Sequence, residues 1–281
     1  MDLHNVELEK QGELPPDPAR RYPWLWVGIG IVIVLLIVGY VVMSRRAETS
    51  DRVNVTDVTP AGPSTTERPL GGEGDDIDMP PLGQTDAITR DLVRKLSSHP
   101  TVAAWLAGDN LLRSFVAATN NVVSSRSPVP HVRRLAPSEP FRVVERGGNT
   151  FIDSRSYARY DRIADAVASV DAAGAARLYS TLKPRLSEAH DELGSGTSFD
   201  ATFERALVLL LQTPVLEGPV RVEPKDGITY GYADPRLEAL APAQKQLLRM
   251  GPRNTKVIQA KLREIATALG IEESRLPAAT T

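Results

Sequence analysis

The feature that most constrains this chain is an apolar run near its N-terminus. Residues 24–43 read WLWVGIGIVIVLLIVGYVVM, twenty residues without a charged side chain. A helix of that length rises about 30 Å, which matches the hydrocarbon core of a bilayer. Aromatic side chains stand at both ends of the run, and arginine pairs at positions 20–21 and 45–46 flank it. The sequence therefore predicts a transmembrane helix, with the lipid bilayer as the partner of residues 23–43.

A cleaved signal peptide is the alternative interpretation of this run. Its apolar region would be shorter, about 7–15 residues, and a small-residue cleavage motif would follow it. The run is instead followed by Ser44-Arg45-Arg46-Ala47-Glu48, which contains no such motif. The sequence therefore favours an anchor that stays attached.

The positive-inside rule does not decide the orientation of this anchor. Three basic side chains precede the run, at positions 10, 20 and 21, and three follow it, at positions 45, 46 and 52. A short tail, one anchor and a long tether are the usual plan for displaying a domain away from a membrane. This plan favours the bacterial inner membrane, with a cytoplasmic N-terminus and a periplasmic C-terminal domain. The opposite orientation, with a cytosolic domain, remains the alternative.

Composition divides the chain into five parts. Residues 1–22 form an N-terminal tail and residues 23–43 form the transmembrane helix. Residues 44–84 are rich in Pro, Gly, Ser, Thr and acidic side chains, so they bury too little apolar surface to offset chain entropy. We therefore expect them to be a disordered linker. Residues 85–270 carry helical and strand patterns and form the folded domain, and residues 271–281 form a C-terminal tail.

Charge and cysteine content exclude several classes of function. Residues 47–84 hold eight acidic and two basic side chains, whereas residues 85–281 hold 22 acidic and 26 basic ones. A net charge of +4 on the folded part is weak for a surface that tracks phosphates, so no nucleic acid is expected as a partner. The absence of cysteine excludes disulfides, Cys-ligated metal centres and a thiol nucleophile.

Periodicity and capping residues predict a mainly α fold of the α+β class, a multi-helix domain with two short β-hairpins. Ser154 is expected to cap one continuous helix over residues 155–170, and Asp109 or Asn110 to cap the helix that ends near Ser124. The hairpins span residues 141–153 and 219–232 and are each followed by a capped helix. They admit two interpretations, a duplication or one small sheet built from both. The remaining helices are expected near residues 85–96, 101–106, 172–193, 199–211, 235–251 and 252–269.

Three stretches together resemble a known family. They are WLAGDNLLRSFV at 105–116, SYARYD at 156–161, and YADP at 232–235 continuing to LLRMGPRN at 247–254. With the apolar run and the Pro-rich tether, they resemble an uncharacterised proteobacterial family, the domain of unknown function numbered 3014. The resemblance covers roughly residues 80–270 and implies a membrane-anchored protein of the bacterial envelope. It brings no known activity, cofactor or catalytic residue.

Basic side chains form the first candidate site. Arg155, Arg159 and Arg162 fall at i, i+4 and i+7 of the predicted helix, so they would form one stripe. The preceding loop and hairpin add four more, at Arg133, Arg134, Arg142 and Arg146. One interpretation is a basic patch for an anionic partner. The favoured alternative is a solvated helix face, on which nearby acidic side chains pair with the arginines.

The turn Arg249-Met250-Gly251-Pro252-Arg253-Asn254 forms the second candidate site. Gly251 and Pro252 end one helix and begin the next. Arg249, Arg253 and Asn254 could hold a carboxylate or phosphate at the new helix N-terminus. They could equally bond carbonyls within the domain, and the sequence favours this structural role.

No residue set forms a catalytic signature. The histidines at 99, 131 and 190 lack metal-ligand spacing, so no metal and no cofactor are expected. Asp200 and Glu204 share a helix face, where they complement the helix dipole. Trp105 and Phe115 are expected in the core.

The sequence thus favours a non-enzymatic module, tethered to the inner membrane, that binds an envelope protein or another anionic partner. The alternative is a membrane-tethered envelope hydrolase, whose carboxylates would meet only in the folded chain. The sequence indicates no oligomeric state.

Overall fold

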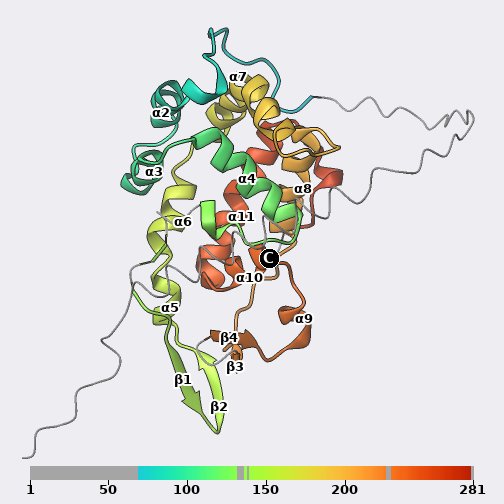
Figure 1. Ribbon diagram of the computed structural model, residues 1–281. Helices are drawn as coiled ribbons and strands as arrows, with labels where there is room; N and C mark the ends of the chain where they lie inside the picture. The colour runs from blue at the N-terminus through green and yellow to red at the C-terminus, as the bar shows by residue number, and fades with distance from the viewer. Residues whose placement is uncertain (1–68, 132–135, 138, 226–228, 280–281) are drawn as a thin grey trace, which may run out of the picture. The chain divides into compact units, whose positions relative to one another are not determined.

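The computed structural model describes residues 69–131, 136–137, 139–225 and 229–279 (Figure 1). The predicted transmembrane run, the N-terminal tail and positions 44–68 of the predicted linker lie outside the described residues. Within the described part of the chain, no helix is both long and apolar enough to cross a membrane.

The described chain is mainly helical with two β-hairpins, as predicted, and the hairpins belong to one small antiparallel sheet. Short 3-10 helices lie at η2 (Leu82–Gln84), η3 (Val129–His131) and η5 (Glu273–Arg275). The strands are β1 (Val143–Arg146), β2 (Asn149–Ile152), β3 (Arg221–Lys225) and β4 (Thr229–Tyr232). The α-helices are α2 (Asp86–Arg94), α3 (Pro100–Leu106), α4 (Leu111–Val123), α5 (Arg155–Ala158), α6 (Asp161–Ala168), α7 (Ala172–Asp191), α8 (Phe199–Leu211), α9 (Pro235–Glu238), α10 (Pro242–Leu248) and α11 (Gly251–Ala268).

The two hairpins combine into a single four-stranded sheet in the order β1-β2-β3-β4. The first hairpin turns through Gly147 and Gly148, whose φ angles of 56° and 73° suit glycine. The hairpins join where Thr150 and Phe151 of β2 pair with Val222 and Arg221 of β3. Pairing therefore selects one sheet built from both hairpins. The pairing of β2 with β3 also brings together two strands that are separated in sequence by helices α5 to α8.

The largest apolar cluster lies among the long helices. Figure 1 shows α4, α7, α8 and α11 packed together, and α2 contacts α4. Aromatic rings fill the centre, where Phe199 and Phe203 of α8 stack with centroids 5.9 Å apart and Tyr179 of α7 lies 5.2 Å from Phe203. Smaller clusters join the sheet to α10 and join α6 to α11.

Some predicted helix caps are confirmed and others are replaced by contacts between elements. Asp171 accepts the Gly174 amide at the start of α7, and Ser198 accepts the Ala201 amide at the start of α8, as expected. The predicted cap of α4 is wrong, because Asn110 takes a left-handed φ of 53° and its side chain forms no capping bond. The carboxylate of Asp86 in α2 instead accepts the amides of Asn110 and Leu111. This cap joins two helices.

The predicted continuous helix over residues 155–170 is also wrong. The structure divides it into α5 and α6, with Arg159 and Tyr160 between them. The side chain of Ser154 forms no capping bond, and Asp153 accepts the Arg155 amide in its place at 2.9 Å. Because the helix is interrupted, Arg155 and Arg162 belong to different helices and the predicted single stripe does not form.

Residues 69–84, here called the strap, pack on the helical core. Composition assigned them to the disordered linker, yet Leu70 and Leu82 are buried in the largest apolar cluster. The Gly71 amide donates to the Leu269 carbonyl at 2.9 Å, and the Asp75 amide donates to the Thr181 hydroxyl at 2.8 Å. The folded unit therefore includes the strap, and the predicted boundary at residue 85 lies too far toward the C-terminus.

The C-terminal boundary at residue 270 is likewise too short. Ile271 and Leu276 are buried in the same apolar cluster as the long helices. Arg263 of α11 pairs with Glu273 at 2.6 Å and also donates to the Pro277 carbonyl. The predicted C-terminal tail is thus held against the domain through at least Pro277.

Close packing of the strap on α7 requires glycine at position 74. A Cβ atom there would lie 2.5 Å from the Thr181 nitrogen and 2.7 Å from the Ser180 carbonyl carbon. Both are backbone atoms, so the strap would have to move. We expect Gly74→Ala to lower the free energy of unfolding of the full chain by about 1–3 kcal/mol in urea denaturation. Gly83→Ala is the control, because a Cβ at Gly83 meets nothing within 4 Å. Equal stabilities of the two variants would contradict strap packing.

Glu238 of α9 ties the second hairpin to α10. One carboxylate oxygen accepts the Tyr232 amide at 3.0 Å. The other pairs with Lys225 at 3.0 Å and Lys245 at 3.1 Å. The Tyr232 amide, with these two ammonium groups, lowers the pKa of Glu238 from 4.5 to about 2. The charged carboxylate therefore stabilises the folded state.

A lowered pKa in the folded state means that this stabilisation is present above pH 4.5 and is lost as the pH falls toward 2. We expect Glu238→Gln to cost about 1 kcal/mol at neutral pH, because solvent screens a partly exposed group. That difference from the wild type should shrink when urea unfolding is repeated near pH 3 and vanish near pH 2. Glu223→Gln, at an exposed position of β3, should cost less than about 0.5 kcal/mol throughout. A Glu238→Gln deficit that is independent of pH would contradict the assignment.

Candidate functional site

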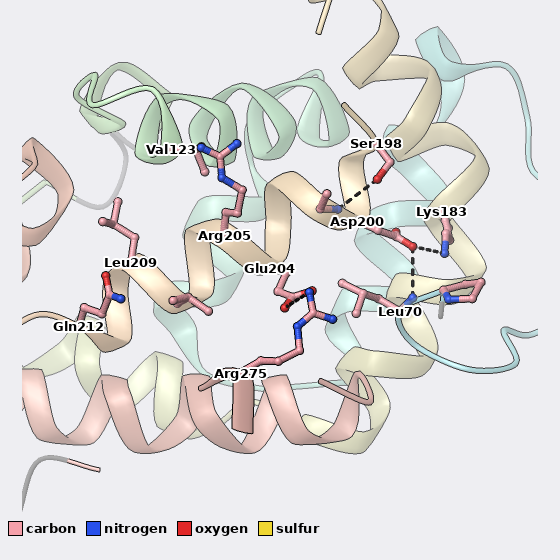
Figure 2. A pocket seen from close by; sticks show the side chains of 13 residues that line it. Leu70, Val123, Lys183, Ser198, Asp200, Glu204, Arg205, Leu209, Gln212 and Arg275 are labelled. Carbon is pink, nitrogen blue, oxygen red and sulfur yellow. Dashed lines mark hydrogen bonds and ion pairs between the residues drawn. The ribbon is translucent and has the colours of Figure 1, made fainter. Parts of the chain in front are cut away.

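A pocket of about 640 Å³ lies along α8 and is here called the α8 pocket. Acidic and basic side chains meet in it (Figure 2). Asp200 and Glu204 are one helical turn apart on α8 and both line it. Lys183 of α7 and Arg275 of η5 face them from other elements. Pro69, Leu70, Val123, Ser198, Ala201, Arg205, Val208, Leu209 and Gln212 complete the lining.

Asp200 is held by three donors, two from α7 and one from the strap. Lys183 Nζ and the Tyr179 hydroxyl each lie 2.5 Å from its carboxylate, and the Leu70 amide of the strap lies 3.2 Å away. Burial, with the hydrogen bond to Asp200, raises the pKa of Tyr179, so its phenol stays protonated as a donor. Asp200 thus joins α7, α8 and the strap.

Glu204 is paired in a similar way. Its side chain is 11% exposed, and one oxygen lies 2.7 Å from Arg275. Both carboxylates of the α8 pocket are therefore engaged in ion pairs within the chain. Arg205 is exposed and is in no ion pair with another residue that the structure describes, so it leaves the charged lining with one surplus positive charge. Such a pocket suits a polar or anionic group better than proton-transfer chemistry.

The polar side chains of the Arg249–Asn254 turn are engaged inside the domain. Asn254 is 1% exposed, and its amide group lies within hydrogen-bond distance of the Tyr157 carbonyl at 3.1 Å, the Met250 carbonyl at 2.9 Å and the Asp161 carboxylate at 2.9 Å. Arg253 pairs with Asp165 at 2.9 Å. These contacts match the structural role that the sequence favoured.

Gly251 and Arg249 also have structural roles in the Arg249–Asn254 turn. Gly251 has a φ of +83°, and a Cβ atom there would lie 2.4 Å from the Tyr157 ring. Arg249 donates to the Tyr230 carbonyl at 3.3 Å, with its guanidinium over the Tyr232 ring. The SYARYD and LLRMGPRN stretches of the sequence therefore pack directly against each other.

The candidate basic patch is only partly brought together. Arg155 pairs with Asp153 at 2.5 Å, and this guanidinium lowers the pKa of Asp153 to about 2. Arg159 donates to the Glu139 carbonyl and lies over the Phe141 and Tyr160 rings. Arg162 is exposed on α6, and Arg133 and Arg134 lie outside the described residues.

One arginine of the first hairpin is placed beside α5. The Ser156 hydroxyl donates to the Arg142 carbonyl at 2.8 Å and accepts the Arg142 amide at 2.7 Å. This fixes the start of β1 against the helix that carries Arg155. Arg142 and Arg146 are both exposed. Arg142 and Arg155 therefore lie near the junction of β1 with α5, and Arg146 lies at the far end of β1 beside the hairpin turn.

Metal ligation has no support in the described residues, among which no three His, Asp or Glu side chains converge on a common point. His190 is 1% exposed, and its Nε2 lies 3.1 Å from the Thr197 carbonyl. His99 caps α3 through Nδ1, which accepts the Thr101 amide at 3.2 Å.

The sequence model of a family described as "Protein of unknown function (DUF3014)" matches residues 111–266. The chain belongs to this family. The match covers more than half of the chain and confirms the resemblance inferred from the three stretches. No curated protein and no solved structure matches the chain.

The DUF3014 match runs from α4 to near the end of α11, so it contains Lys183, Asp200 and Glu204 but not Arg275 or the strap. The sequence predicts that Asp200 and Glu204 share a helix face, but it does not predict their partners. The i, i+4 spacing was the available signal for a shared pocket. Lys183 lies 17 residues from Asp200 and gave no such signal. Arg275 fell in the segment that was predicted to be a tail.

Proposed function

We propose that this DUF3014 protein is a single-pass protein of the bacterial inner membrane whose helical domain is a non-enzymatic interaction module displayed in the periplasm. The apolar run at 24–43 supports the anchor, and the polar composition of positions 44–68, with eight charged residues and eight serines or threonines, supports a flexible tether. A chain of about 25 flexible residues reaches roughly 25–30 Å, so the domain would stand clear of the lipid headgroups.

The observation that carries the binding proposal is the state of the carboxylates in the α8 pocket. A hydrolase built on two acids needs carboxyl groups that can reach the substrate and exchange protons. Asp200 is instead held by Lys183, Tyr179 and the strap, and Glu204 is held by Arg275. These groups join elements of the fold, which favours an interaction module over the alternative of an envelope hydrolase.

The basic junction of β1 with α5 supports an anionic envelope partner. Arg142 is exposed just before β1, Arg146 is exposed at the end of β1, and Arg155 is 73% exposed on α5. Arg155 already has Asp153 as a counterion, so Arg142 and Arg146 supply most of the available positive charge. Complementary charge would guide and orient such a partner.

Topology can be tested with single cysteines, because the chain has no native cysteine. Ser64→Cys places a thiol in the predicted tether, and Asn5→Cys places one in the N-terminal tail. With the outer membrane permeabilised and the inner membrane intact, an impermeant thiol reagent should label Ser64→Cys and spare Asn5→Cys. Lysis of the inner membrane should expose both. The reverse pattern would contradict the periplasmic assignment and move the search for a partner to the cytosol.

Charge reversal tests whether the junction binds the partner. Crosslinking in intact cells followed by affinity capture of the full chain should enrich a reproducible envelope component. Arg142→Glu with Arg146→Glu should reduce this product about fivefold, because both charges face the partner. Arg126→Glu with Arg177→Glu changes net charge equally at other exposed positions and should leave the product unchanged. Equal losses in both variants, or recovery of abundant background alone, would contradict the proposal.

A further inference from the structure

An apolar cavity of about 290 Å³ lies within the helical core. Side chains of α2, α4, α7 and α11 line most of it, and none of its lining residues is charged. A second apolar hollow of about 200 Å³ lies between α2, α3 and α6. Val93, Trp105 and Val170 line both spaces, so the two meet at these side chains.

Trp105 marks the path from this cavity toward solvent. The sequence suggested a core tryptophan, yet Trp105 is only half-buried and stands at the junction of the two spaces. Thr101 and Val102, which line the outer hollow, are also half-buried. The two spaces together therefore form an elongated apolar site that reaches the surface beside α3.

One polar atom in the inner cavity has no partner. Thr89 of α2 is 2% exposed and lines the cavity, and its hydroxyl forms no hydrogen bond with any described residue. Other buried threonines in helices donate to the carbonyl four residues earlier, as Thr119, Thr181, Thr202 and Thr255 do. Because an unsatisfied buried hydroxyl costs stability, its position indicates where a ligand atom would complete the bond.

We infer that this cavity binds a single aliphatic chain that carries one neutral hydrogen-bonding group, either a hydroxyl or an ester carbonyl. The apolar lining favours hydrocarbon, since apolar cavities stay dry and accept apolar guests. The elongated shape through the gap at Trp105 favours a chain over a compact ring system. The Thr89 hydroxyl supplies the single polar contact. A charged group is disfavoured inside, because no lining residue could neutralise it.

The test uses the full chain in amphipol and titrates it calorimetrically with decanol, methyl decanoate and decanoate. Decanol represents a chain alcohol and methyl decanoate an acyl ester, so these two arms distinguish the sources of the polar group. We expect saturable binding of at least one of them. Decanoate, which is charged at neutral pH, should bind about tenfold more weakly. Absence of saturable binding of both neutral probes, or equally tight binding of decanoate, would overturn the inference.

Ala175→Phe tests the site itself. Ala175 lines the inner cavity, and a phenyl ring there would occupy the space of the chain. We expect binding to weaken by at least about tenfold. Ala87→Phe places the same ring at an exposed position of α2 that lines no described pocket, and it should bind like the wild type. Equal binding by Ala175→Phe and Ala87→Phe would overturn the inference, since the heat would then come from amphipol or a surface site.

Thr89→Val tests the polar contact with a change of similar volume. Removing an unpartnered hydroxyl should leave the ligand-free protein at least as stable as the wild type. Binding of the preferred neutral probe should nevertheless weaken about fivefold, because the ligand oxygen loses its partner. Misfolding would lower both the stability of the protein and its affinity for the probe. Weaker binding by a variant that is at least as stable as the wild type therefore cannot arise from misfolding. Unchanged or tighter binding would overturn the assignment of Thr89 as the ligand contact.

Discussion

The buried amide of Asn254 joins α5 and α6 to the start of α11. It is within hydrogen-bond distance of a carbonyl of α5, a carboxylate of α6 and the carbonyl of Met250 just before α11. Because α5 follows β2 closely in the chain and α11 packs against α7 and α8, this side chain helps to connect the sheet to the helical core. Gly251 allows the contact, since any Cβ would collide with the Tyr157 ring. The most distinctive segment of the sequence therefore has a structural explanation.

Charged groups elsewhere join elements in the same manner. Asp86 caps α4 from α2, Asp200 links α7 to the strap, and Glu238 links both strands of the second hairpin to α10. A buried or half-buried carboxylate needs such partners, because leaving it unpaired is costly. Asp200 and Glu204, the two acidic residues of the α8 pocket, are thus engaged in holding the fold. Among the described residues, the exposed arginines near β1 and an apolar cavity with one unpartnered hydroxyl are available for a partner.

The boundaries of the folded unit show where composition misleads. Residues 69–84 read as a linker because they are rich in Gly, Pro and acidic side chains. Two of those glycines are there because the backbone passes against α7, with no room for a Cβ at Gly71 or Gly74. Glycine required by close packing and glycine in a flexible tether look identical in a sequence. The few apolar side chains of the strap, Leu70 among them, could be recognised as core only once α7 and α8 were in place.

The sequence by itself determined the apolar run, the family, the two hairpins and most helix positions, because these depend on residues close together in the chain. Local caps at Asp171 and Ser198 were predictable for the same reason. Tertiary structure alone decided that the hairpins share one sheet, that α5 and α6 separate, and that Asp86 replaces the cap expected at Asn110. It also decided that Asp200 meets Lys183 and that an unpartnered Thr89 faces an apolar cavity. Such contacts depend on how helices distant in sequence pack, and no local pattern records them.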